Sequence, residues 1–224
     1  MAWAEQSSFL LFCMVFALGA RHGFDLDHLA TIDSITRTVK QNSRLARLVG
    51  FLFSLGHGFV VILMSFTISS GILQTRSPLW LETVGHWVSV IFLLLFGLLT
   101  LWSVLSHSHA KPTGVRGLVF GKLVGEANNP LLIILIGALF ALSFDTFSQV
   151  ALFSISASVM AGYFFPVILG IVFMLGMMAS DGLNGVFVSL LIQRADKRSA
   201  FISRGIGLTI ACFSLIIAFR EMVC

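Results

Sequence analysis

The residues best suited to chemistry lie close together in one run, RHGFDLDHLATIDSITR, at residues 21–37. The run belongs to a predicted membrane helix, where an ionisable side chain is costly unless it is paired, hydrated or bound to an ion. A regular helix turns by about 100° per residue, which puts His22, Asp25 and His28 side by side on one stripe. Two imidazoles with a carboxylate between them suit a divalent transition metal. We interpret this stripe as the centre of a metal site.

Asp27 points away from that stripe in a regular helix. It joins His22 only if the helix is distorted near Gly23; otherwise it orients another group, for instance by accepting a hydrogen bond from a ligand histidine. Two other interpretations stay open, a proton relay and a structural ion-paired knot around Arg21. Two histidines on one stripe exceed what pairing with Arg21 requires, so metal binding is the leading interpretation.

Three further ionisable residues occupy other apolar segments. His57 lies between Gly56 and Gly58, which allow an ion or another backbone to approach closely. Asp145 stands in a polar patch that we expect in the outer half of the membrane, and Asp181 in one that we expect in the inner half. We predict that His57 completes the metal site and that the two aspartates are stations along the ion's path.

The composition is that of a membrane protein. Of the 224 residues, 57% are hydrophobic and 11% are charged, against about 25% charged in a soluble domain. The mean hydropathy is +0.98. The net charge of +4 comes from short basic segments between apolar runs and forms no stripe for nucleic acid. The three cysteines lack the paired spacing of a disulfide framework or a cysteine metal site.

The apolar runs predict an all-α, polytopic protein with about six transmembrane helices, because a span needs about 20 apolar residues. We place the helices at residues 8–36, 46–71, 80–105, 129–158, 162–192 and 200–220. Eleven of the fourteen basic residues follow the first, third and fifth of them. By the positive-inside rule both termini lie outside, in a multi-pass protein of the cell inner (plasma) membrane. His86, beside Trp87 in the third segment, is expected to be interfacial.

A short internal repeat suggests two halves of opposite orientation. The first and fourth segments share Phe-Ala-Leu, at residues 16–18 and 140–142, and the second and fifth share Phe-x-Leu-Gly, at 53–56 and 173–176. Three helices in each half would form a 3+3 inverted repeat, as in many transporters. We predict one transmembrane transporter domain over 1–224, with halves at 1–110 and 125–224 joined by a cytoplasmic loop.

The run at residues 21–37 resembles the signature helix of the nickel/cobalt transporter family, in which His is followed after four residues by Asp-His. His22, Asp27 and His28 match those three positions, and Asp25 matches the intervening Asp. Weaker family motifs match in the family's order at FSLGHGFVV around His57, LSFDTFSQV around Asp145 and LGMMASDGLNG around Asp181.

The departures from the family pattern lie beside the matched residues. Gly58 and Phe59 replace small hydroxyl residues, Gln149 stands where Glu is usual, and Gly182 and Asn184 replace polar or acidic positions. The family also has eight helices, with the signature in the second. The resemblance implies uptake of Ni²⁺ or Co²⁺, with metal contacts at His22, Asp25, Asp27, His28, His57, Asp145 and Asp181.

We therefore predict a transporter of a divalent transition-metal cation and not an enzyme. The chain has no HExxH motif, no nucleophile elbow and only six histidines. It has no phosphate-binding loop, so we expect neither ATP hydrolysis nor an ATPase subunit, and no cofactor besides the transported ion. The expected partners are the metal ion and the lipid bilayer; the sequence assigns no oligomeric state. The alternative is a proton-coupled transporter of another solute on a related scaffold.

Overall fold

The computed structural model describes residues 2–70, 129–142, 147–158, 164–193 and 197–223, together with individual positions between 83 and 102. Its described elements are all helices, which confirms the all-α prediction for this part of the chain. They are α1 (Ala2–His22), α2 (Leu26–Thr38), α3 (Ser43–Ser69), α5 (Pro130–Phe140), α6 (Phe147–Ser158), α7 (Phe164–Gln193) and α8 (Lys197–Val223).

Three of the described helices are long and apolar enough to cross a membrane, and a bent pair adds a fourth. The three are Ser43–Thr67, Phe164–Gln193 and Gly205–Val223, and the pair is Ser8–His22 with Leu26–Thr38. These four correspond to the first, second, fifth and sixth predicted segments. Most of the third segment lies outside the described residues, and α5 in the fourth is a shorter apolar helix. The structure is that of an integral membrane protein with at least this set of candidate spans.

The single helix predicted over 8–36 is wrong, because the chain breaks after His22. α1 and α2 meet at an angle of 57°. Asp25 has extended backbone angles (φ −64°, ψ 146°) and precedes the first residue of α2. Gly23 lies against α7, where a Cβ atom would overlap the hydroxyl oxygen of Ser180. This close approach requires glycine, and glycine also weakens the helix at the point where it bends.

The helix predicted over 129–158 is likewise described as two, α5 and α6. α5 begins with Pro130 at its first turn, and the side chain of Asn129 accepts a hydrogen bond from Leu131 N at 3.0 Å. Such a cap satisfies one of the free amides at the start of a helix. α5 ends at Phe140, and Ala141 and Leu142 form a turn. The apolar run continues through this turn, so hydropathy alone did not predict it.

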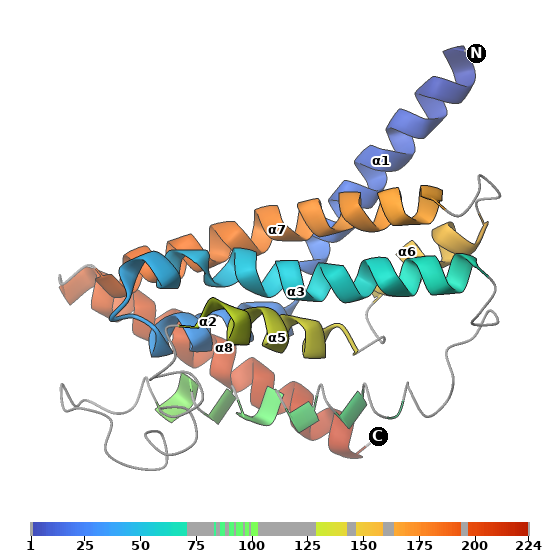
Figure 1. The fold of residues 1–224 in the computed structure, drawn as a ribbon. Helices are drawn as coiled ribbons and strands as arrows, with labels where there is room; N and C mark the ends of the chain where they lie inside the picture. Colours follow the sequence, from blue (N-terminus) through green and yellow to red (C-terminus); the bar gives the residue numbers. More distant parts are fainter. Residues whose placement is uncertain are drawn as a thin grey trace.

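α3 and α7 lie side by side and antiparallel at the centre of the molecule (Figure 1). Glycines bring the backbones together: a Cβ on Gly50 would overlap the carbonyl of Asp181, and one on Gly56 would overlap the carbonyl of Ile134 on α5. In lipid, where apolar burial does not drive helix association, small residues permit the van der Waals contacts that hold helices together. α1 crosses α7 and extends beyond the bundle toward the N-terminus (Figure 1).

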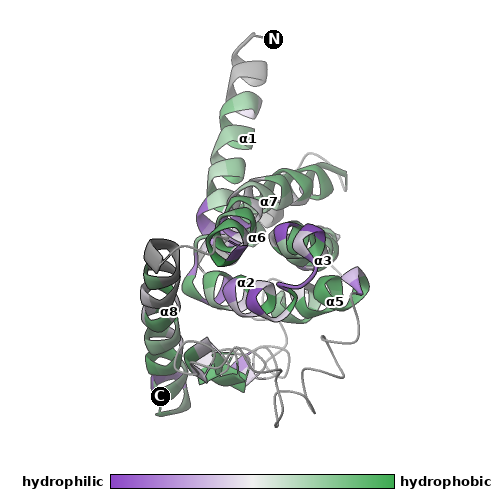
Figure 2. Cartoon of the chain, turned by 90° about the vertical axis from the view of Figure 1, so that its left-hand side faces the viewer, coloured by the Kyte–Doolittle hydropathy of each residue, from purple (hydrophilic) through white to green (hydrophobic). Residues whose placement is uncertain are grey.

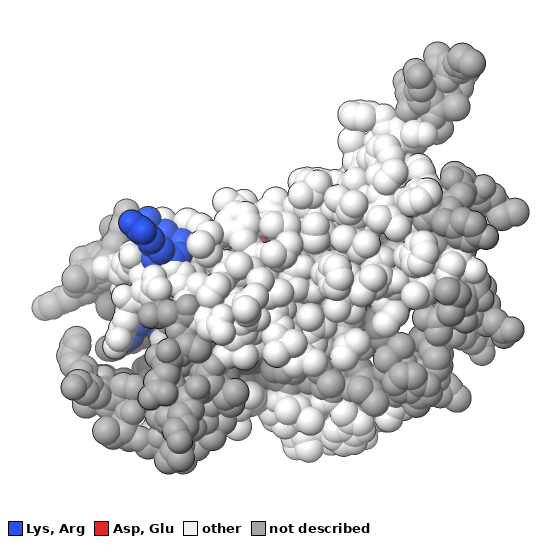
Figure 3. Space-filling model, in the orientation of Figure 1, with Lys and Arg blue, Asp and Glu red and all other residues white. Residues whose placement is uncertain are grey.

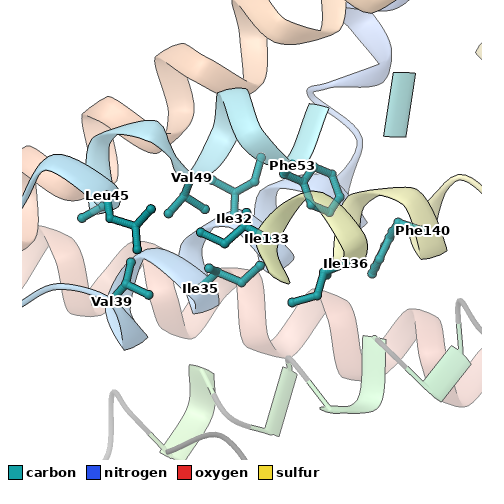
Figure 4. Packing of buried hydrophobic residues seen from close by; sticks show 10 residues of the cluster. Ile32, Ile35, Val39, Leu45, Val49, Phe53, Ile133, Ile136 and Phe140 are labelled. Atoms are coloured by element: carbon teal, nitrogen blue, oxygen red, sulfur yellow. The ribbon is translucent and has the colours of Figure 1, made fainter. Parts of the chain in front are cut away.

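The described part of the chain buries two apolar clusters, one on either side of the α1–α2 break. Figure 4 shows the first, in which Ile32 and Ile35 of α2 pack against Phe53 of α3 and against α5. The second joins Val15 of α1 and Phe173 of α7 to α3 and α6. Figure 2 shows that hydrophobic residues make up most of the described helices, as expected for helices that face lipid. The packing thus fixes both halves of the broken helix against α3 and α7.

The glycine contacts predict which helix crossings tolerate a side chain. Gly56→Ala would place a methyl group on the backbone oxygen of Ile134, which cannot rotate away. We expect a loss of about 1–3 kcal/mol, the usual cost of overpacking, seen as a lower melting temperature of the detergent-solubilised protein. Gly205→Ala on α8 is the control, because no atom of the described residues lies within 4 Å of a Cβ there. Equal effects of the two substitutions would contradict the assigned crossing.

Candidate metal centre

Three buried imidazoles meet beside the break in the first membrane segment. His22 is the last residue of α1, His28 lies in the first turn of α2, and His57 lies in the middle of α3. Their exposed fractions are 1%, 0% and 1%. One ring nitrogen from each lies within 4.8 Å of the other two, a spacing that suits a shared metal ion. The structure thus brings together the three histidines that the sequence predicted as ligands.

The break changes how His22 and His28 come together. The sequence placed them on one stripe of a continuous helix, whereas in the structure they lie on two helices at a bend. The ring centroids of His22 and His28 are 4.5 Å apart, and that of His57 lies 5.1 Å and 4.8 Å from them. The expected proximity holds, although the regular helix from which it was predicted does not exist.

Two carboxylates orient two of the rings. Asp25 Oδ2 lies 2.9 Å from His22 Nδ1, and Asp181 Oδ2 lies 3.0 Å from His28 Nδ1. Since an ionised carboxylate only accepts hydrogen bonds, each Nδ1 carries the hydrogen, and in the neutral imidazole each Nε2 then keeps a lone pair. His22 Nε2 faces His57 Nε2 at 3.2 Å. His28 Nε2 is buried and has no hydrogen-bond partner in the described structure. The Nε2 atoms of His22 and His28 are therefore the nitrogens available to bind a metal.

Asp181 lies in this cluster, whereas the sequence predicts it in a separate polar patch farther along the ion's path. It is fully buried on α7, and its Oδ2 also accepts a hydrogen bond from Ser54 Oγ at 2.6 Å. Gly23 and Gly50 allow α1, α3 and α7 to approach closely around it. The contact between His28 and Asp181 spans 153 positions of the chain, so nothing local in the sequence indicated it.

Ser54 and Gln149 are polar neighbours of the cluster that were not among the predicted site residues. Ser54 precedes His57 by three positions on α3, so both residues lie on one face of the helix. This spacing is the signal by which Ser54 was detectable. Gln149, in the first turn of α6, has its Nε2 atom 2.9 Å from His57 Nε2. It is 0% exposed, and its position beside His57 depends on tertiary packing alone.

The remaining predicted site residues have different positions. Asp27 is half-buried in the first turn of α2, where its Oδ1 accepts a hydrogen bond from the backbone amide of His28 at 3.0 Å. Asp145 lies outside the described residues. Arg21 donates to Ser148 Oγ at 2.7 Å, and Asp33 forms a two-point pair with Arg37.

Aromatic rings close the cluster on its apolar sides. The ring of Phe53 lies 5.0 Å from that of His28, and the ring of Phe173 lies 5.5 Å from that of His22, centroid to centroid. Rings at these positions keep bulk water from the imidazoles and strengthen electrostatic interactions inside. His86, by contrast, is about one-third exposed and lies 3.9 Å from Glu221 of α8, in keeping with an interfacial position.

Comparison with known proteins assigns the chain to a family. The profile of the family described as "High-affinity nickel-transport protein" matches residues 8–223. The high-affinity nickel-transport protein NixA of Helicobacter pylori is 34% identical over 203 residues, which are 78% of this chain and 61% of that protein. The nickel transporter NixA of Staphylococcus aureus is 34% identical over 202 residues, covering 77% and 59%.

A cobalt transporter also matches. The cobalt transport protein NhlF of Rhodococcus rhodochrous is 28% identical over 206 residues, which cover 79% of this chain and 58% of that protein. The chain spans about three fifths of the length of these three relatives. No solved structure matches. The family match covers nearly all of the helices that form the histidine cluster, and it confirms the resemblance inferred from the signature run. This chain belongs to the high-affinity nickel-transport family, a family of transporters and not of enzymes.

Proposed function

We propose that this protein binds Ni²⁺ or Co²⁺ at the histidine cluster and carries the ion across the cell membrane into the cytoplasm. The observation that carries the proposal is the meeting of three buried imidazoles from α1, α2 and α3. Imidazole nitrogen is a favoured ligand of both metals. The names of the relatives agree, since two are nickel transporters and one is a cobalt transport protein.

The proposed ligands are the Nε2 atoms of His22, His28 and His57. Asp25 and Asp181 are not ligands in this proposal. Each accepts a hydrogen bond from the Nδ1–H of a ligand ring and so orients it, as carboxylates commonly do around metal sites. Asp27 stabilises the start of α2, where a negative charge is favourable beside free backbone amides. Asp145 stays a predicted contact of the ion on its outer approach.

The charges at the cluster balance those of the cargo. Three neutral imidazoles with two nearby carboxylates give the empty site a formal charge of about −2, which a divalent cation cancels. An uncompensated charge in a membrane is costly, so a neutral complex is the arrangement that the lipid environment favours. This balance supports a dication as the transported species.

The membrane potential supplies a driving force for inward movement. A divalent cation gains about 4.6 kcal/mol on crossing 100 mV, twice the value for a single charge. Visible Lys and Arg side chains gather where α3 begins and α7 ends (Figure 3). There Arg47 of α3 contacts Gln193 of α7. The positive-inside rule makes this the cytoplasmic end.

The helix crossings support the two-halves arrangement predicted from the repeated motifs. Gly19 of α1 packs against the backbone carbonyl of Phe173 on α7, and Gly176 of α7 packs against the backbone carbonyl of Phe16 on α1. α5 and α3 cross in the same reciprocal way, through Gly137 with the Phe53 carbonyl and Gly56 with the Ile134 carbonyl. Each half thus has a broken helix pair (α1–α2 or α5–α6) followed by a long helix. Rocking of two such halves around a fixed central site is a common mode of alternating access.

Loss of one imidazole should abolish metal binding. His22→Ala removes a central nitrogen and leaves Asp25 without its ring partner. We expect no detectable Ni²⁺ binding by titration calorimetry of the purified protein, whereas His86→Ala should bind like the wild type. A wild-type protein that retains no nickel or cobalt would contradict the proposal and favour transport of another solute.

Loss of the buried carboxylate should weaken binding without abolishing it. Asp181→Asn keeps the shape of the side chain but removes the charge behind His28, and we expect about 10–100-fold weaker Ni²⁺ binding. Glu221→Gln is the matched control, because it alters a carboxylate beside His86 instead. Unchanged affinity in Asp181→Asn, with intact folding, would show that Asp181 does not support the site.

A further inference from the structure

The side-chain amide of Gln149 lies beside the ring nitrogens of the histidine cluster. Its Nε2 atom lies 2.9 Å from His57 Nε2, the nitrogen that lies 3.2 Å from His22 Nε2. Gln149 is 0% exposed, and its Oε1 atom has no hydrogen-bond partner in the described structure. One polar atom of this amide is therefore in use, while the other is buried and unused.

Hydrogen-bond chemistry makes this amide orientation suit a site without a bound cation. The amide nitrogen only donates, so in this orientation it donates to the lone pair of His57 Nε2. A cation bound to that lone pair removes the acceptor and repels the partial positive charge of the N–H groups. Rotation of the terminal amide by 180° exchanges its nitrogen and oxygen and presents Oε1 to the cation. The buried, unused oxygen then gains a partner.

The distances around His57 match those between neighbouring ligands of one ion. Two ligands with metal bonds of about 2.1 Å lie about 3.0 Å apart at a right angle and about 3.4 Å apart at a tetrahedral angle. The two contacts of His57 Nε2, at 2.9 Å and 3.2 Å, lie close to these values. The polar end of Gln149 thus occupies the place of a ligand next to His57.

We propose that Gln149 binds the transported cation through Oε1, as an uncharged fourth ligand contributed by α6. The inference rests on the proposed function, since it assigns one more contact at the same site. Asp25 and Asp181 already balance the charge of a dication, so a neutral oxygen adds a bond without adding charge. A carboxylate at this position would make the loaded site negative and hold the cation more tightly.

The experiment compares two substitutions that separate the oxygen from the N–H group. Gln149→Glu keeps an oxygen but loses the donor, and Gln149→Leu loses both. Ni²⁺ affinity is measured by titration calorimetry on the purified full chain at fixed neutral pH. Gln193→Glu and Gln193→Leu on α7 are matched controls, because Gln193 contacts Ser189 and Arg47 near the end of the helix.

A ligand role predicts opposite effects at position 149. Gln149→Leu should bind Ni²⁺ about 10–100-fold more weakly, Gln149→Glu about tenfold more tightly, and the Gln193 variants like the wild type. Unchanged or weaker binding by Gln149→Glu would overturn the proposal, because the N–H group would then be the important part or neither group would matter. This comparison decides the question even if Gln149→Leu does not fold.

The same measurements keep this inference separate from the proposed function. If the wild type binds Ni²⁺ and His22→Ala does not, the histidine site stands whatever the Gln149 variants do. Only the role of Gln149 then fails when Gln149→Glu does not bind more tightly. A wild type without Ni²⁺ affinity overturns both. The absorption bands of Co²⁺-loaded protein give a second readout, since they change when an oxygen ligand is lost and not when a distant hydrogen bond is.

Discussion

The break between α1 and α2 is the feature on which the rest of the site depends. In lipid, backbone amides and carbonyls need partners within the protein, so an interrupted helix persists only where neighbouring helices surround it. Gly23 permits that contact against α7, and the break puts His22 and His28 at the junction of two helix ends. A straight helix would carry the same residues along one face but would not hold both rings against Asp25, Asp181 and His57 in this way.

The hydrogen bonds of the polar site depend on close packing of the helices. Glycines at the crossings of α3 with α7 and α5, and of α1 with α7, bring the backbones near enough for short side chains to reach across. Ser54 can therefore donate to Asp181, and Asp181 can reach His28. Larger residues at the crossings would separate these groups and leave buried polar atoms unsatisfied, which costs more than the lost packing alone.

The sequence predicted most of the helices and the chemistry, but not the breaks or the long-range contacts. The apolar runs placed α3, α7 and α8 to within a few residues, because lipid requires continuous hydrophobic segments. The apolar run continues across residues 141–142, and the signature run at 21–37 was predicted as a regular helix with no break at 23–25, so the sequence predicted one helix at each place where the structure has two. The residue types of the signature run indicated a metal site. Partners such as Asp181 and Gln149 depend on how distant helices pack, which periodicity does not encode.

The order of the site residues along the chain affects how the protein is made. His22, His28 and His57 all lie within residues 22–57, whereas Gln149 and Asp181 come much later along the chain. During synthesis the imidazoles therefore enter the bilayer well before the buried carboxylate that orients His28. A partly translated chain without Asp181 lacks half of the negative charge that balances a dication. The metal site is therefore complete only after α7 has been inserted against α3.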